Sequence, residues 1–251
     1  MLVTTTIEDG VAVLRLNDGA HRNVLQPAMT LAIEGAVDGA LEEGARAVVL
    51  SAEPPVFCAG GSLDSLLERS VPLTEIYRGF EALARCPVPT VAAVAGAAVG
   101  AGMNLALCCD VILASPAARF DPRFLDVGIH PGGAHLWRLA ARVGPQGAAA
   151  MVLMGEVLSG DEAAARGLAW RCVPDAELEA AALALARRAA GRDPALVART
   201  KATLRASGQV LDPNEALALE LEAQEWSMGR PEFEDTVRRL RASLGGRRGK
   251  P

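Results

Sequence analysis

The sequence lacks the cysteine spacing that marks a disulfide framework or a zinc site. Its five cysteines are odd in number, two of them are adjacent, and none belongs to a Cys-x-x-Cys pair. It also lacks a cluster of histidine, cysteine and aspartate with the spacing of metal ligands. The Gly-x-Ser-x-Gly motif of a nucleophilic serine and the signature of a phosphate-binding loop are absent from the sequence too. We therefore expect a cytoplasmic protein without a metal, in which the cysteines are small buried apolar residues.

The sequence also lacks an excess of positive charge and a membrane signal. The net charge of −5 argues against a nucleic-acid partner, because phosphates favour a basic face. The first nine residues contain no basic start followed by an apolar run, so we expect no signal peptide. The apolar stretch Val88–Leu107 is rich in alanine and glycine, with Pro89 at its head and Asn104 within it. This composition favours a buried core segment over a membrane span.

The 251 residues, 51% of them hydrophobic, suit one large domain or one domain with a smaller appendage. Before about Pro145, strand and helix patterns alternate, which indicates an α/β fold. The expected elements there are a hairpin around Asp9-Gly10, a helix at 27–43, a short helix at 103–107, and strands at 46–50, 90–94 and 111–114. Helical patterns follow at 146–154, 160–166, 175–190, 194–206, 213–228 and 232–244. We predict a core over residues 1–190 and a helical region over 191–251, with a disordered tail from Gly245.

Two loops rich in small residues carry the strongest functional signal. The first, Phe57–Leu63, contains Gly60-Gly61 and precedes a helix for which Ser62 is a suitable N-cap. The second, Ala95–Leu105, also leads into a helix. Amides at a helix N-terminus carry partial positive charge. One amide from each loop, donated to the same carbonyl oxygen, would form an oxyanion hole.

Both loops resemble segments of the enoyl-CoA hydratase/isomerase (crotonase) family. Phe57–Leu63 is similar to the family's Phe-x-Ala-Gly-x-Asp-Leu loop, with Ser62 in place of Asp. Val94–Asp110 is similar to its Asn-Gly-x-Ala-x-Gly-Gly-Gly…Cys-Asp segment, with Ala95 and Ala101 replacing Asn and the middle Gly. Segments 16–25 and 118–133 resemble Leu-Asn…Arg-Asn-Ala-Leu and Ala-x-Phe…Gly…Pro-Gly-x-Gly, so the likeness runs in order over nearly the whole chain.

The resemblance implies an α/β fold of the ClpP/crotonase type, a spiral of ββα units followed by a helical trimerisation region. It implies an acyl-CoA thioester substrate in fatty acid metabolism, with no cofactor apart from the coenzyme A of the substrate. It also implies a homotrimer or a dimer of trimers, and the C-terminal region has apolar faces for this assembly. Carried over by position, the enolate-stabilising amides are those of Gly61 and Ala101. The coenzyme A moiety would lie along Arg22, Val24, Ala59, Gly61 and Leu63.

The sequence departs from the family at two positions where hydratases carry glutamate: these are Asn104 and Phe124. Neither an amide nor a phenyl ring exchanges a proton at neutral pH. Positioned proton transfer contributes roughly 10²–10⁴-fold per group, so we expect weak or absent hydration of enoyl-CoA. Two alternatives stay open: an enzyme that moves protons with His130 or Asp126, His130 being the better candidate, or a non-catalytic acyl-CoA-binding protein. Taken singly, His130 and His135 are each expected to have a structural role more often than a catalytic one.

Overall fold

The computed structural model describes residues 1–68 and 71–247, and the chain divides into two compact units, Met1–Arg192 and Asp193–Pro251. The last helix, α10 (Pro231–Arg247), runs through the first residues of the predicted disordered tail. The remainder of that tail, 248–251, lies outside the described residues.

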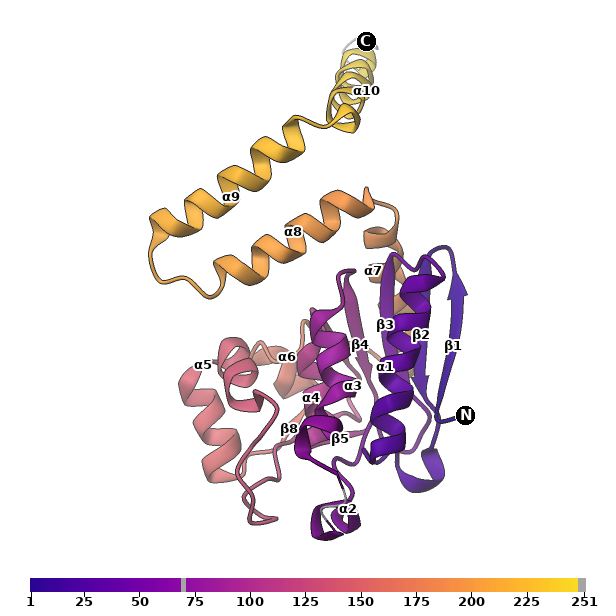
Figure 1. Cartoon of the computed structure of the whole chain (residues 1–251), viewed down its shortest axis with the longest axis vertical. Helices are drawn as coiled ribbons and strands as arrows, with labels where there is room; N and C mark the ends of the chain where they lie inside the picture. Colours follow the sequence, from indigo (N-terminus) through magenta and orange to yellow (C-terminus); the bar gives the residue numbers. More distant parts are fainter. Residues whose placement is uncertain (69–70, 248–251) are drawn as a thin grey trace. The chain divides into compact units, whose positions relative to one another are not determined.

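A six-stranded sheet forms the centre of the first unit (Figure 1). Its strands, in spatial order, are β1 (Val3–Glu8), β2 (Val11–Leu16), β3 (Ala47–Ala52), β4 (Thr90–Val94), β6 (Val111–Ala114) and β9 (Arg171–Cys172). The first two strands pair antiparallel, and all other neighbours pair parallel. Asp9 and Gly10 both adopt positive φ between β1 and β2, as a tight hairpin turn requires. The predicted hairpin is therefore confirmed.

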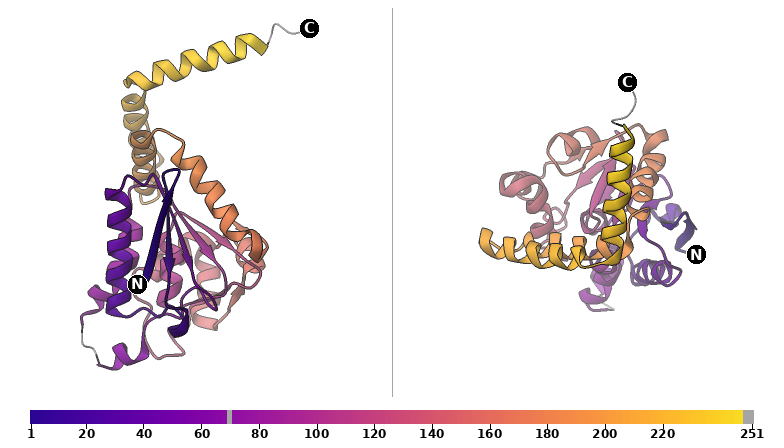
Figure 2. Two further views of the ribbon diagram at one scale, coloured as in Figure 1. Left: turned by 90° about the vertical axis from the view of Figure 1, so that its right-hand side faces the viewer. Right: turned by 90° about the horizontal axis from the view of Figure 1, so that it is seen from above.

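Both faces of this sheet are covered by helices, which makes three layers (Figure 2). The alternation of side chains in β3 shows this directly, since Val48 and Leu50 enter one apolar core and Val49 enters the other. The larger core is completed by α1 (Pro27–Glu42), α3 (Leu73–Arg85) and α4 (Ala101–Cys108). On the second face, α7 (Asp175–Ala190) contributes a stripe of four residues spaced by four: Leu178, Ala182, Ala186 and Ala190.

A smaller sheet carries the segments that lead into the candidate site. It consists of β5 (Ala97–Val99), β7 (Arg119–Asp121) and β8 (Leu158–Ser159). β5 runs parallel to β7 and directly precedes α4, while β7 precedes the Phe124 segment. The remaining elements of the unit are η1 (Gly19–His21), α2 (Leu63–Glu68), α5 (His135–Met154) and α6 (Gly160–Ala165).

Helix α5 corrects one prediction. The predicted helix at 146–154 matches the part of α5 after a kink at Gly144, whose φ is +72°, but the sequence pattern misses the part before it, which begins at His135. The pair Gly144-Pro145 interrupts the pattern that marks a helix in the sequence, and this hides its first half. Arg142, in that first half, donates hydrogen bonds to the carbonyls of Leu107 and Cys109 at the end of α4.

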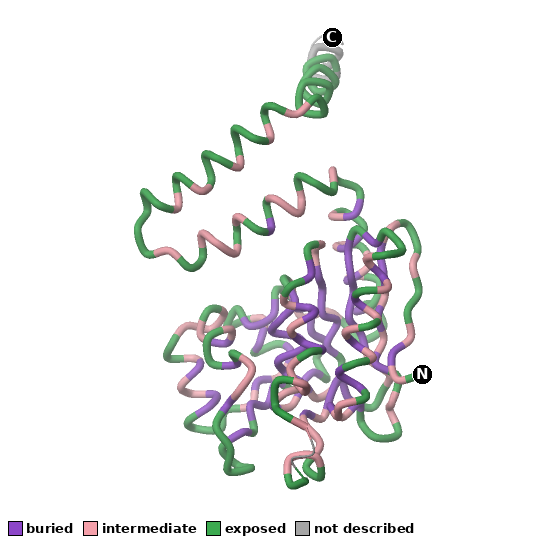
Figure 3. Tube along the Cα trace, viewed as in Figure 1, coloured by how far each residue is buried: buried purple, intermediate pink, exposed green. Residues whose placement is uncertain are grey.

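The second unit contains α8 (Pro194–Ser207), α9 (Pro213–Met228) and α10. Asp193 and Asp212 cap the first two by accepting hydrogen bonds from main-chain amides, so both Asp-Pro start signals are confirmed. Most residues of α9 are exposed (Figure 3). None of the described helices has the length and apolar character needed to cross a membrane.

Candidate active site

The two small-residue loops lie side by side. Cys58 donates its main-chain amide to the carbonyl of Ala97 at 3.0 Å, and Val99 donates its amide to the carbonyl of Cys58 at 3.0 Å. These bonds form a short parallel bridge between the first loop and β5. The residues that follow, Gly60-Gly61 on one loop and Gly100-Ala101 on the other, therefore leave the bridge as neighbours.

Two glycines permit this close approach. Gly60 has a φ of +95°, and a Cβ on it would lie 2.7 Å from the carbonyl oxygen of Val99 and 3.9 Å from the amide nitrogen of Ala101. A Cβ on Gly102 would lie 2.4 Å from the carbonyl oxygen of Cys58. Real Cβ atoms do not approach oxygen so closely, so each loop needs a residue without a side chain at this contact.

The amides of Gly61 and Ala101 are free to donate. Around Gly61, Leu25 donates to the carbonyl of Gly60 at 2.7 Å and Ser62 donates to the carbonyl of Leu25 at 3.0 Å, which bypasses the Gly61 amide. Ala101 is the first residue of α4, where a helical amide has no partner in its own helix. Within residues 1–68 and 71–247, neither amide has a main-chain acceptor. That both amides serve one oxygen stays a prediction.

Asn23 anchors the first loop, and no separate signal for this role is visible in the sequence. Its buried side-chain amide donates to the carbonyls of Glu53 and Val56 at 2.8 and 2.9 Å and accepts a bond from the amide of Asp18. Its own carbonyl accepts from the thiol of Cys58 at 3.0 Å. Burial raises the pKa of this thiol to about 12, so Cys58 acts here as an un-ionised donor and not as a nucleophile.

A cavity of about 630 Å³ opens beside Gly61, a size common for small-molecule sites. Its walls are mostly apolar, and none of the described lining residues has a titratable side chain. The lining residues are Leu25, Gly61, Ser62, Ser65, Leu66, Val71, Pro72, Leu73, Ile76 and Ile129. Among the residues predicted to bind coenzyme A, Gly61 lines this cavity, Arg22 and Leu63 are exposed nearby in the chain, and Val24 and Ala59 are half-buried.

The two glutamate positions are both engaged with His135. Asn104 lies buried on α4, donates its side-chain amide to the carbonyl of Gly132 at 3.1 Å, and has its Oδ1 2.8 Å from Nδ1 of His135. The ring of Phe124 meets the imidazole edge-on, with 4.8 Å between ring centres. The sequence favours a structural role for His135 but holds no sign that it joins these two positions, because the contact spans 31 residues of chain.

The hydrogen bonds fix the protonation of this imidazole. Because the Asn104 amide nitrogen donates to Gly132, its oxygen faces the ring, and Nδ1 of His135 must be the donor. Burial lowers the pKa of His135 to about 4, so the ring is neutral at pH 7 and Nε2 carries a lone pair. In the described part of the chain, this buried nitrogen has no hydrogen-bond partner.

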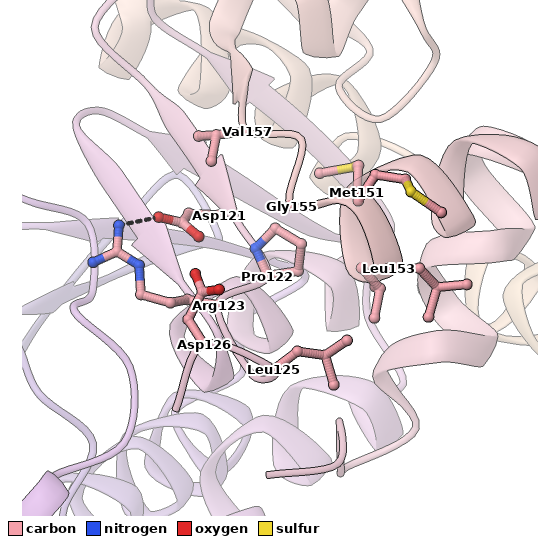
Figure 4. Close-up of a pocket in the computed structure, with 11 residues that line it drawn as sticks. Asp121, Pro122, Arg123, Leu125, Asp126, Met151, Leu153, Gly155 and Val157 are labelled. Atoms are coloured by element: carbon pink, nitrogen blue, oxygen red, sulfur yellow. Dashed lines mark hydrogen bonds and ion pairs between the residues drawn. The ribbon is translucent and has the colours of Figure 1, made fainter. Parts of the chain in front are cut away.

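The predicted proton-transfer residues His130 and Asp126 are both exposed. Nδ1 of His130 lies 2.8 Å from the carbonyl of Pro131. Asp126 lines a separate cavity of about 210 Å³, where Figure 4 shows it on the side of Arg123, opposite Leu153 of α5. Over the described ranges, no hydrogen bond joins His130 to Asp126. The structure thus shows no contact between the two candidates, and a role of either in proton transfer stays a prediction.

The described residues contain no group of three or more histidine, cysteine and acidic side chains that could hold a metal ion. The polar groups that the two loops offer are therefore main-chain amides, and His135 is connected to the second loop through Asn104. Amides of this kind bind carbonyl oxygens and the anions that form from them.

Comparison with known proteins identifies the family of the chain. A model of the enoyl-CoA hydratase/isomerase family matches residues 6–237. The chain is 39% identical over 242 residues to a Mycobacterium tuberculosis protein named "Probable enoyl-CoA hydratase EchA14", covering 92% of this chain and 94% of that protein. It is 34% identical over 208 residues to the 2,3-dehydroadipyl-CoA hydratase of Escherichia coli, covering 80% of each.

Solved structures give the same result for the fold. The structure of an enoyl-CoA hydratase from Mycobacterium smegmatis superposes with a TM-score of 0.89 at 29% identity, covering 97% of both chains. Human enoyl-CoA hydratase domain-containing protein 3 gives a TM-score of 0.89 at 26% identity, again over 97% of this chain. The predicted crotonase-type α/β fold is confirmed, and the chain belongs to the enoyl-CoA hydratase/isomerase family.

Proposed function

We propose that this protein binds an acyl-CoA thioester and polarises its carbonyl with the amides of Gly61 and Ala101, without hydrating it efficiently. The observation that carries this proposal is the pair of unpartnered amides on two loops that main-chain hydrogen bonds join. The apolar cavity beside Gly61 has room for an acyl chain. The names of the similar proteins, which are hydratases of acyl-CoA thioesters, support the substrate class.

Weak hydration is the finer part of the proposal. Addition of water to an enoyl thioester needs a base for the water and an acid for the α-carbon. The residues at the two positions where hydratases carry glutamates are here an amide and a phenyl ring, and both pack against His135. His130 and Asp126 stay candidates for proton transfer, although both are exposed.

A non-catalytic acyl-CoA-binding protein is the second candidate. The observation in its favour is the cavity itself, whose described lining offers two serines but no carboxylate and no histidine. Such a pocket binds an acyl chain by burying apolar surface and leaves the thioester chemically untouched.

The predicted assembly into trimers or dimers of trimers belongs to this proposal. The side chains of Leu217, Leu221 and Trp226 are exposed on α9 in the single chain. Apolar side chains gathered on one helix are typical of a protein interface. The second unit would then serve oligomerisation in a cytoplasmic protein that needs no cofactor.

The test combines binding with turnover. Calorimetry with butyryl-CoA measures binding, and the loss of enoyl absorbance with crotonyl-CoA measures hydration. We expect binding, together with hydration at least about 100-fold slower than that of a relative with both glutamates, because each positioned proton-transfer group is worth about that factor or more. A turnover number equal to that of such a relative would refute the proposal of weak hydration. Absence of butyryl-CoA binding would refute the proposed substrate class.

A further inference from the structure

His135 is the one described histidine that is fully buried, and polarisation of the thioester by main-chain amides leaves it without a role. It lies at the first residue of α5, directly after the Pro131–Ala134 loop. A neutral histidine with both nitrogens satisfied would be an ordinary core residue. Here one nitrogen is satisfied by Asn104, whereas Nε2 is buried without a partner. Buried polar atoms are nearly always paired, so this exception calls for an explanation.

Two contacts connect the imidazole to the loop that carries the Ala101 amide. Asn104 lies three residues after Ala101, on the next turn of α4, and its side chain bonds to Nδ1. Phe124, whose ring touches the imidazole, also approaches Gly100, since a Cβ on Gly100 would lie 3.9 Å from two carbons of that ring. One hydrogen bond therefore joins the imidazole to α4, the helix that begins at Ala101, and Phe124 links it to the neighbourhood of Gly100, the residue before Ala101.

We propose that Nε2 of His135 removes and returns the α-proton of the bound acyl-CoA thioester. The inference rests on the proposed function, because the enolate formed needs the amides of Gly61 and Ala101. The α-C–H bond breaks, its proton passes to Nε2, and its electron pair moves onto the thioester oxygen. The imidazolium then returns the proton to the α-carbon, which is exchange, or to the γ-carbon of a β,γ-unsaturated chain. The second outcome moves the double bond into conjugation, and neither outcome consumes water or an oxidant.

The environment of the ring suits this task. Asn104 holds Nδ1 protonated, so the lone pair is always on Nε2. Burial lowers the pKa of the imidazole to about 4, so the ring is unprotonated at neutral pH and its Nε2 lone pair is available to accept a proton. A single base can remove a proton and return it, whereas hydration needs a base for the water and an acid for the α-carbon at the same time. The site is thus suited to proton shuttling and poorly suited to hydration.

Phe124 packs against this imidazole. Its ring is nearly buried and meets the imidazole edge-on. In this proposal the ring turns aside to let the substrate carbon reach Nε2. A smaller residue at this position should open the path. The variant Phe124→Leu is therefore predicted to exchange α-protons faster than the native protein, provided that His135 is present.

The experiment uses the full-length protein in D₂O. Mass spectrometry follows deuterium incorporation at the α-carbon of butyryl-CoA, and absorbance follows the conversion of 3-butenoyl-CoA to crotonyl-CoA. We expect His135→Gln to lower both rates by about 100-fold or more, the usual size of a positioned proton transfer. Its dissociation constant for butyryl-CoA should stay within about threefold of the native value. The double variant Phe124→Leu/His135→Gln should be as slow as His135→Gln alone.

Two further readouts separate chemistry from structure. The exchange rate of the native protein should rise with pH through a pKa near 4. The exchange rate of His135→Gln should not show this rise. The loss in His135→Gln should also exceed the loss in His130→Gln by at least about tenfold. Equal or reversed losses would overturn the assignment. If butyryl-CoA binds but neither the native protein nor Phe124→Leu exchanges protons, the inference fails and the binding protein remains. If butyryl-CoA does not bind, the proposed function fails with it.

Discussion

Replacing His135 with glutamine should change how the stability of the protein depends on pH. Glutamine is close to histidine in size and can still donate to Asn104, but it does not titrate. In the native fold, burial lowers the pKa of His135 from 6.5 to about 4. The fold therefore favours the neutral ring. As pH falls below 6.5 the unfolded chain takes up a proton that the folded chain does not, and the fold loses stability.

The magnitude follows from the pKa values of the unfolded and folded chains. A tenfold difference in proton affinity corresponds to about 1.4 kcal/mol, so a pKa lowered from 6.5 to about 4 corresponds to about 3 kcal/mol. This contribution is complete above pH 6.5, decreases steadily below it and is lost once the pH has fallen through 4. The glutamine variant lacks this contribution. Its free energy of unfolding, compared with that of the native protein, should therefore improve by about 3 kcal/mol between pH 7 and pH 4.

Urea denaturation of both proteins at several pH values between 4 and 7.5 measures this difference. Carboxylates also titrate over that range, but they are the same in both proteins and cancel in the comparison. We expect the glutamine variant to be the less stable of the two at pH 7, because it loses the ring contact with Phe124. The difference in free energy of unfolding between the native protein and the variant should narrow or reverse as pH falls. Parallel curves across the whole range would show that His135 is not held neutral by burial, and the reasoning would be wrong.

The remaining predictions concern the two loops and the second unit. Gly102→Ala should lower the free energy of unfolding by about 1–3 kcal/mol, because its Cβ would meet the Cys58 carbonyl. Gly35→Ala lies on α1 with no atom near its Cβ, so it should raise the free energy of unfolding by about 0.5–1 kcal/mol. Urea denaturation that ranks the two variants in the opposite order would contradict this prediction. Asn23→Ala removes three side-chain hydrogen bonds around the first loop, so it should lower the free energy of unfolding by at least about 1–3 kcal/mol and weaken butyryl-CoA binding measured by calorimetry. The control Asn17→Ala changes an exposed residue and should alter the stability and the binding little. Light scattering at micromolar protein should give the mass of a trimer or hexamer, and a monomer mass would refute the proposed assembly role of α9.

Local signals in the sequence sufficed for most elements of the fold. The hairpin at Asp9-Gly10 and the Asp-Pro helix starts were predictable because a turn or a cap depends on adjacent residues. The first half of α5 was not, because it is a separate helical segment that ends at the kink at Gly144, and the pattern after Gly144-Pro145 indicates only the second segment. Local propensity is a weak guide wherever tertiary contacts decide the outcome.

The candidate site, too, could be predicted from the sequence only in part. The two small-residue loops were visible in the sequence, since glycine clusters before a helix have a direct geometric meaning. The contact between Asn104 and His135 was not, because it joins residues far apart in the chain and depends on a single side-chain bond. The sequence therefore directed attention to His130, which precedes a proline-glycine loop but lies exposed in the structure.

The packing of Asn104, Phe124 and His135 constrains how this lineage could change its chemistry. A glutamate introduced at position 104 alone would extend its carboxylate toward an imidazole that already lies within hydrogen-bond distance of that side chain. Nδ1 of His135 would then donate a hydrogen bond to the new carboxylate, which would lower its basicity toward water. A glutamate at position 124 alone would leave a void against the same ring. A glutamate at either position would therefore meet His135 before it met a substrate, so the effect of restoring one glutamate depends on the residue at position 135.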